Sequence, residues 1–341
     1  MNLPDISHFL VIPRLRVQNA NAVSSPLTHG FPSMTAFLGL MWALERQLKQ
    51  AGVELPLNAV GVVCHDHQEQ VNDGGFVKSF CLTRNPVDKS GKTAAIVEEG
   101  RIHMDISLVF GVNIGTGEWQ DEYPAQVADI LNRMRIAGGT VHLPAKPWLQ
   151  RYQPFAVSCG ESAKLASLTR KLLPGFTLVA RDDLLDQRLA ELKRTQSQAT
   201  RLDAWLSLAR INWHYQPVKE SAEETAGNTA ENAAENAAEN AAENAAGKTK
   251  GEWKNDRTGQ GWLVPIPVGY GALSEVYPAG KVANTRDPHT PFRFVESLYS
   301  IGQWIAPHRL TSVEQLLWYA DSQSENGLYR CRNNFIKTQN D

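Results

Sequence analysis

The alternation of apolar and polar residues predicts four strands in the first 150 residues. They cover residues 8–17, 59–67, 103–114 and 140–143. Each run is rich in valine, isoleucine or leucine and is bounded by polar residues, which is typical of a strand.

Two helices are expected between these strands. The first begins at Ser33, which serves as its N-cap, and runs through MTAFLGLMWALERQL. The second covers YPAQVADILNRMRIAGG, where Val127, Leu131 and Met134 fall on one helical face and Gly138 ends the helix.

The resulting order is strand, helix, strand, strand, helix, strand. It predicts an α+β fold with a ferredoxin-like or RNA-recognition-motif (RRM) type core. In such a core, two helices cover one face of a four-stranded antiparallel sheet, and we expect the other face to be free for binding. This core would occupy residues 1–150.

A long polar excursion at about 68–102 interrupts the core between its second and third strands. It carries five cations, and turn residues such as Asn85-Pro86 and Ser90-Gly91 divide it. A loop of this length in a compact domain is usually functional or disordered. Its apolar islands favour order, so we expect a protruding hairpin, or thumb.

The remaining chain divides by composition. Residues 151–218 are expected to be mainly helical. Residues 219–251 hold a fourfold AENA repeat with no large apolar side chain, which predicts a disordered acidic insertion. Residues 252–341 are rich in glycine, proline and aromatic residues and are expected to pack back on the core. GWLVPIPVGYGALSEVYPAG (261–280) is not expected to form a regular central strand, because proline cannot donate to a ladder.

Net charge is −2, but seven glutamates lie in residues 220–246, so the rest of the chain carries −2 + 7 = +5. A mildly basic remainder permits a localised phosphate-binding track. The sequence shows no signal peptide and no apolar run long enough for a membrane span. Four widely spaced cysteines indicate neither a disulfide framework nor a zinc ribbon. We therefore expect a soluble cytoplasmic protein.

The stretch after the first strand, RLRVQNANAVSSPLTHGFPS (14–33), is unusually rich in hydrogen-bonding side chains. Arginine binds phosphate with two parallel bonds, whereas Asn, Gln and Ser bond base edges and sugar hydroxyls. The alternative is that Asn and Ser cap the backbone of an irregular turn. The candidate binding residues in this stretch are Arg14, Arg16, Gln18, Asn19, Asn21, Ser24, Ser25 and His29.

Other segments add weaker candidates. The thumb contributes Arg84, Asn85 and Arg101, and the end of the second predicted helix contributes Arg133 and Arg135. Gly269 and Tyr270 lie in a glycine-rich stretch where a backbone could approach a ligand closely. This stretch matches neither a Walker loop nor a GxGxxG fingerprint, and we expect no cofactor.

CHDH at 64–67 raises the possibility of a metal site. On a strand, Cys64 and Asp66 would face one way and His65 and His67 the other, so one face offers two ligands. We expect no metal and, since no nucleophile elbow or spaced carboxylate pair stands out, no catalytic constellation.

Eight segments together closely resemble the second Csy subunit of type I-F CRISPR systems, the Cas-five-type member of the RAMP superfamily. They are PRLRVQNANAVSSPLTHGFP (13–32), LTRNP (82–86), TAAIVEEGR (93–101), RIAGG (135–139), RKLLPGF (170–176), GWLVPIPVGYGALS (261–274), TPFRFVESL (290–298) and LWY (317–319). The resemblance covers nearly the whole chain apart from the acidic insertion.

This resemblance implies a noncatalytic subunit that holds the 5′ handle of crRNA in the surveillance complex. It also implies a heterodimer with the large Csy subunit, contact with the first backbone Csy subunit, and a place near target DNA beside the protospacer-adjacent motif. The alternative is a metal-independent endoribonuclease, as some related RAMP proteins are, with His65, His29 and Tyr270 as acid and base.

Overall fold

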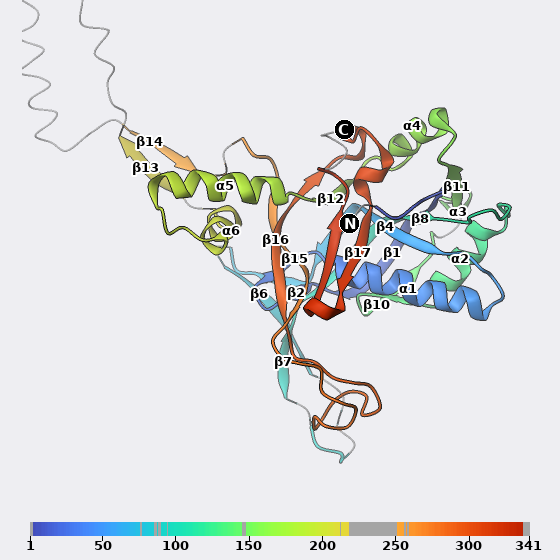
Figure 1. Ribbon diagram of the computed structural model, residues 1–341, viewed down its shortest axis with the longest axis horizontal. Helices are drawn as coiled ribbons and strands as arrows, with labels where there is room; N and C mark the ends of the chain where they lie inside the picture. The colour runs from blue at the N-terminus through green and yellow to red at the C-terminus, as the bar shows by residue number, and fades with distance from the viewer. Residues whose placement is uncertain are drawn as a thin grey trace, which may run out of the picture.

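The computed structural model is an α+β fold built around one large antiparallel sheet (Figure 1). It describes residues 3–75, 77–84, 87, 90–93, 95–144, 148–211, 213–217, 251–255, 257 and 259–336.

The four strands predicted for the N-terminal region are present. They are β1 (His8–Asn21), β4 (Leu57–Glu69), β8 (Arg101–Val112) and β10 (Gly139–His142). They lie side by side in the order β4-β8-β1-β10, and each neighbouring pair is antiparallel. Strand β11 (Phe155–Ser158) pairs with the first part of β1 on the edge that β10 occupies further along.

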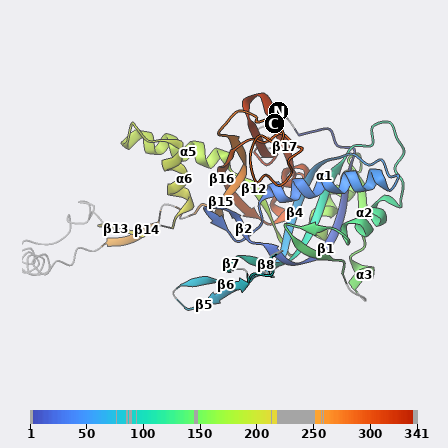
Figure 2. The ribbon, with the colours of Figure 1, turned by 90° about the horizontal axis from the view of Figure 1, so that it is seen from below.

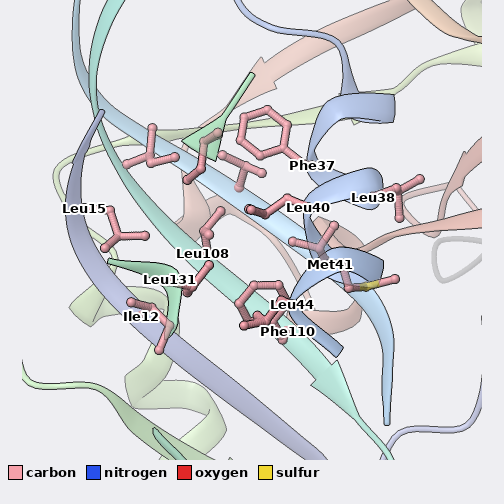
Figure 3. Packing of buried hydrophobic residues seen from close by; sticks show 14 of the residues in the cluster. Ile12, Leu15, Phe37, Leu38, Leu40, Met41, Leu44, Leu108, Phe110 and Leu131 are labelled. Atoms are coloured by element: carbon pink, nitrogen blue, oxygen red, sulfur yellow. The ribbon is translucent and has the colours of Figure 1, made fainter. Parts of the chain in front are cut away.

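Helices α1 (Met34–Gln50) and α2 (Tyr123–Leu131) cover one face of these strands. Ser33 is the N-cap of α1, as predicted, and its Oγ accepts the Thr35 N–H at 3.2 Å. Figure 3 shows Phe37, Met41 and Leu44 of the helix directed at side chains of the sheet. Burial of each such side chain stabilises the fold by roughly 1.5–3 kcal/mol, so this interface is the main core of the molecule.

The second helix is shorter than the apolar spacing predicted. It ends at Leu131, and the following residues form strand β9 (Arg135–Ile136), which pairs with β10. Ala137 and Gly138 make the turn between them with φ angles of 47° and 80°. Met134 is buried without being helical, because the chain returns to the same core in a hairpin.

The prediction that the face opposite the helices would be free is only partly correct. Its first half is apolar and buried, with Phe9, Val11, Val63 and Val109 in a second hydrophobic cluster. This half is covered by α4 (Ser162–Lys171) and by the segment carrying η1 (Pro307–Arg309) and η2 (Val313–Leu316). The remaining half of that face is polar.

Three short strands lie in the segment for which a protruding hairpin was predicted, and we call the described part of residues 71–99 the thumb. Its strands β5 (Val71–Asp73), β6 (Lys78–Arg84) and β7 (Ile96–Glu99) pair antiparallel in that order. The thumb projects from the body of the molecule (Figures 1 and 2).

The C-terminal strands extend the same sheet beyond β4. They are β12 (Phe176–Ala180), β15 (Leu263–Ala272), β16 (Val295–Ile305), β17 (Trp318–Gln323) and β18 (Leu328–Asn333). Because β12 and β17 both pair with β4, the pairings β4-β12-β16-β15-β18-β17 close on themselves. Trp318 is fully buried, and its indole N–H donates to the Leu178 carbonyl at 2.8 Å.

The prediction for residues 261–280 is wrong in part, because β15 lies between β16 and β18 in the sheet. Its prolines explain how this is possible. Pro265 and Pro267 pair with β16, whereas β18 pairs only with Gly269–Gly271. The two prolines are two residues apart, so both ring nitrogens point to the same side. If this is the side where β18 does not pair with the prolines, their missing N–H groups cost no hydrogen bond between strands.

The other elements lie around this sheet. Helices α5 (Asp182–Thr195) and α6 (Arg201–Ala209) lie at the end of the molecule away from α1 and α2 (Figure 1). Short elements complete the chain: β2 (Val23–Ser25), β3 (Thr28–His29), α3 (Trp148–Arg151) and η3 (Ser324–Asn326). Among the described helices, none has both the length and the apolar composition needed to cross a membrane.

Strands β13 (Trp213–Pro217) and β14 (Gly251–Asn255) form a separate two-stranded hairpin. The predicted acidic insertion lies between them and, except for Gly251, falls outside the described residues.

We predict that Gly269→Ala strongly destabilises the fold. Gly269 has a φ of 147°, and an added Cβ would lie 2.0 Å from the Tyr329 carbonyl oxygen. Backbone strain and overpacking together should lower the free energy of unfolding by more than about 2 kcal/mol in denaturant titration. Gly280→Ala is the matched control, because Gly280 has a φ of 74° but its nearest neighbouring atom would be 3.7 Å away. Equal decreases in the two variants would refute the close-approach explanation.

Candidate nucleic-acid interface

The second half of the sheet face opposite α1 and α2 is polar, and we refer to it as the polar face. It consists of Arg16, Gln18, Asp66, Gln68, Arg101, His103, Asp105, Arg135, Thr140 and His142. These residues alternate with buried side chains such as Val17, Met104 and Val141, which belong to the core beneath α1 and α2. Residues on alternate positions of a strand point to opposite faces, so the polar face spans five neighbouring strands.

Cross-strand register places four of the predicted binding residues on this face. Arg16 lies opposite His142 and Asp105, and Gln18 lies opposite Thr140. Thr140 in turn lies opposite Arg135, and Arg101 begins β8. Arg16 and His142 are exposed, and neither side chain makes a hydrogen bond or ion pair with any described residue. Arg16 is therefore available to an anionic ligand.

Two further predicted residues, Arg14 and Asn19, form bulges in β1. Both have left-handed backbones, with φ angles of 55° and 56°. At each bulge two residues of β1 face one residue of β8. The freed N–H of Arg14 donates to Ser107 Oγ at 3.1 Å, and that of Asn19 donates to His103 Nδ1 at 3.2 Å. The bulges are therefore held by side chains of β8.

The prediction that a loop follows residue 17 is accordingly wrong. Strand β1 continues to Asn21, because the two bulges each insert one residue and keep the apolar side chains on the helix-covered face. Leu10 and Ile12 precede the first bulge, Val17 lies between the two, and Ala20 follows the second, yet all four belong to one core.

Arg14 is held half-buried below the polar face. Its Nη1 donates to Asp105 Oδ2 at 3.3 Å, and its guanidinium lies 5.5 Å from the centroid of the Tyr152 ring. Only 18% of the Arg14 side chain is exposed. Arg14 therefore places a positive charge beneath the polar face, whereas the Arg16 side chain is exposed to solvent.

His65 connects the polar face to the C-terminal strands. Its Nδ1 lies 2.6 Å from the Pro174 carbonyl oxygen, which can only accept, so Nδ1 carries the proton. Its Nε2, 2.6 Å from Ser107 Oγ, therefore accepts the serine hydroxyl proton in the neutral ring. Burial lowers the pKa of His65, since the charged imidazolium is poorly solvated there.

The turn before α1 uses most of its polar side chains internally. Asn21 Nδ2 donates to the Val23 carbonyl, and Asn21 Oδ1 accepts the Val23 N–H. Ser24 donates to the Thr28 carbonyl at 3.1 Å, and Ser25 is buried with its Oγ 2.6 Å from Thr28 Oγ1. Here the alternative interpretation, local backbone capping, describes the geometry.

His29, at the end of this turn, faces the thumb and β4. Its Nδ1 lies 2.9 Å from Glu69 Oε1, and its ring meets the Phe80 ring edge-on. The His29 side chain is 60% exposed, so it contributes to the outer surface as well as to this contact.

The predicted arginines outside β1 are spread along the surface. Arg101 forms an ion pair with Glu99 at 3.0 Å and donates to the Asn19 carbonyl, so it ties the base of the thumb to the second bulge. Arg84 is exposed at the end of β6, and Arg133 is exposed between α2 and β9. Arg135 donates to the Gly138 carbonyl at 3.1 Å. Asn85 lies outside the described residues.

Gly269 and Tyr270 lie on β15, in a different part of the sheet. Because Gly269 has no side chain, the Tyr329 backbone packs closely against it. Strand β18 therefore fills the space through which a ligand would approach this glycine. Tyr270 is 40% exposed and stacks on Tyr329 with ring centroids 6.3 Å apart. The structure does not place these two residues on the polar face.

The CHDH segment does not alternate as predicted, because β4 has a bulge at His65 between Cys64 and Asp66. Within the described part of the chain, no group of three or more His, Cys, Asp or Glu side chains is arranged to hold a metal ion. Burial raises the pKa of the Cys64 thiol to about 12, and metals bind the thiolate form. All four cysteines are free thiols.

Sequence reasoning missed six residues of the polar face as binding candidates: Asp66, Gln68, His103, Asp105, Thr140 and His142. The signal was available in the period-two pattern of the strands. In HMDIS and TVHL the polar residues alternate with Met104, Ile106 and Val141, which are buried.

Comparison with known proteins identifies relatives over almost the whole chain. The family model described as CRISPR-associated protein (Cas_Csy2) matches residues 10–331. The CRISPR-associated protein Csy2 of Pseudomonas aeruginosa (strain UCBPP-PA14) is 41% identical over 348 residues, which cover 97% of this chain and 96% of that protein.

We predict that His65 makes folding stability depend on pH. Because its pKa in the fold is below the ordinary value of 6.5, the unfolded chain takes up a proton that the folded chain does not. The free energy of unfolding should therefore decrease as pH falls below about 6.5 and level off below the folded pKa.

The measurement is thermal denaturation of the wild type and of His65→Gln between pH 5 and pH 8. The variant should lose part of the wild-type pH dependence. His8→Gln is the control, because burial also lowers the pKa of His8 and its replacement should leave the His65 contribution in place. An unchanged pH dependence in His65→Gln would contradict the assignment.

Proposed function

Because the chain belongs to the Csy2 family of CRISPR-associated proteins, we propose that it is a noncatalytic, RNA-binding subunit of a type I-F surveillance complex. Its ligand would be the 5′ handle of the crRNA. The observation that carries this proposal is the polar face. Its side chains come from alternate residues of neighbouring strands, and neither α1 and α2 nor α4 covers them.

The arrangement of the core supports an RRM-type, RAMP-like interpretation. The strand order β10-β1-β8-β4, with α1 and α2 on one face, is the order expected of a βαββαβ unit. In RRM proteins, single-stranded RNA crosses the sheet face opposite the helices. In this chain that face is available only in its polar half, so the RNA path is limited to the ends of β1 and β8 nearest the thumb.

The chemistry of the polar face suits an unpaired RNA strand. Arg16 and Arg135 are exposed cations that can bind phosphate, and Gln18 and Thr140 can bond sugar hydroxyls or base edges. His103 and His142 offer flat rings on which bases can stack. Three arginines stand against two aspartates on this face, so it attracts a polyanion without being strongly basic.

The thumb lies beside the same surface and supports closure over an extended polymer. Arg101 joins its base to the bulge at Asn19, and Arg84 lies at the end of β6 toward its tip. The other partners that we propose are the large Csy subunit in a heterodimer, the first backbone Csy subunit, and target DNA near the protospacer-adjacent motif. Such a complex would work in the cytoplasm.

The alternative, a metal-independent endoribonuclease, has less support from the geometry. Both ring nitrogens of His65 are occupied, and His29 bonds to Glu69. Tyr270 stacks on Tyr329 in a different part of the sheet. A general acid or base must reach the proton that it transfers, and these three groups do not converge on one position.

We predict that Arg16→Ala weakens binding to handle RNA. Removal of one phosphate-binding cation should lower the slope of log affinity against log salt concentration by about 0.7 for a single strand. The measurement is fluorescence anisotropy of a labelled handle oligonucleotide over a series of salt concentrations. Arg194→Ala is the control, because Arg194 is an exposed arginine in the last turn of α5. Equal affinities and slopes for wild type and Arg16→Ala would count against the polar face as the RNA site.

We also expect purified protein to leave CRISPR repeat RNA intact in EDTA, because both ring nitrogens of His65 are occupied and Tyr270 does not line the pocket that His29 and His65 share. Gel analysis of the incubated RNA checks this. A discrete product that disappears in His65→Ala would favour the endoribonuclease instead.

A further inference from the structure

A pocket of about 420 Å³ opens beside the polar face, between β4, β15 and the segment that leads into α1. Asp66 lines this pocket and is also a residue of the polar face, so the two surfaces meet at Asp66. The volume lies within the roughly 300–1,000 Å³ typical of sites for small organic groups. Neither bulge of β1, at Arg14 or Asn19, and neither ion pair that Asp105 or Arg101 forms uses this space.

The pocket has aromatic walls. Trp262 and Phe176 meet edge to face with ring centroids 5.8 Å apart, and 52% and 45% of these residues are exposed. Trp304 lies 6.0 Å from Trp262, and Phe31 meets Trp304 edge-on at 5.0 Å. Large rings exposed at the mouth of a pocket are suited to stacking on an unpaired base, because every base has a flat π-face.

The polar side chains of the pocket include two carboxylates, together with three histidines and two serines. Asp66 and Glu69 both line it. Asp66 Oδ1 accepts the His67 N–H, and Glu69 Oε1 lies 2.9 Å from His29 Nδ1. Asp66 Oδ2 accepts no hydrogen bond from the described residues. Carboxylates repel phosphate but accept hydrogen bonds from an exocyclic amino group, as on cytosine.

We propose that this pocket holds one unstacked nucleobase that bears an exocyclic amino group, while the phosphates of the same strand lie along the polar face. The base stacks against Trp262, and its amino group donates to Asp66. The inference rests on the proposed function, because it assigns a base-recognition role to a pocket beside the RNA path. It makes the interface selective, since uracil has no exocyclic amino group.

The test compares binding of the full chain to two single-stranded probes, oligocytidine and oligouridine of about eight nucleotides. These bases differ at position 4, where cytosine has an amino group and uracil a carbonyl. Wild type should prefer oligocytidine on the order of tenfold. Asp66→Asn should remove most of this preference, because an amide can both donate and accept.

Trp262→Ala should weaken oligocytidine binding by roughly 5- to 100-fold, because one base then has no ring to stack on. Trp262→Phe keeps a flat ring and should retain most of the affinity. Trp213→Ala is the matched control, because Trp213 is 58% exposed on β13 and should leave binding unchanged. Circular dichroism melting of each variant separates loss of binding from loss of fold.

The outcomes separate this inference from the proposed function. If Arg16→Ala weakens binding but a folded Trp262→Ala does not, the base pocket is refuted and the RNA-binding role stands. Equal binding of the two probes by wild type would also refute the pocket. If neither probe nor handle RNA binds the wild type, both proposals fail. Should Trp262→Ala leave RNA affinity unchanged and instead abolish co-purification of other Csy subunits, the pocket belongs to a protein contact.

Discussion

The structure depends on one constraint, which is that the apolar side chains of β1 must stay against α1 and α2 over the whole strand. Successive side chains of a strand point to opposite faces, so a shift of one residue moves all later apolar side chains to the wrong face. The residues of β1 that face α1 and α2 have even numbers at first, as at Leu10, odd numbers after the first bulge, as at Val17, and even numbers again at Ala20. The bulges at Arg14 and Asn19 absorb these changes, and hydrogen bonds to Ser107 and His103 hold them.

The same constraint divides the opposite face of the sheet. Before the first bulge, Phe9 and Val11 are apolar and are buried beneath α4 and the segment with η1 and η2. After it, Arg16 and Gln18 occupy that face and reach solvent. Buried apolar side chains and exposed polar side chains therefore occupy different halves of one surface. His65 lies at their boundary, where it bonds both to Ser107 behind the bulge and to Pro174 before β12.

Sequence patterns predicted the elements whose signals are local. Ser33 marked the start of α1, and apolar runs bounded by polar residues marked β4 and β8. The patterns failed where distant pairing decides the outcome. Nothing local shows that Arg14 and Asn19 adopt left-handed conformations within a strand, because Ser107 and His103 stabilise them from β8. Likewise, Pro265 and Pro267 are acceptable in β15 only because β18 begins to pair further along, at Gly269. Chemistry alone selected the candidate binding residues, whereas the grouping of four of them on one face became visible only in the strand register.

The hairpin of β13 and β14 has a consequence for handling the protein. Because Pro217 pairs with Gly251, the chain leaves and re-enters the fold at neighbouring points. Lengthening a connection between fixed, adjacent ends costs only about 0.6 kcal/mol for each doubling. A fluorescent reporter or an affinity tag can therefore be inserted there without displacing either terminus, and the assembled particle could be tracked through an internal label.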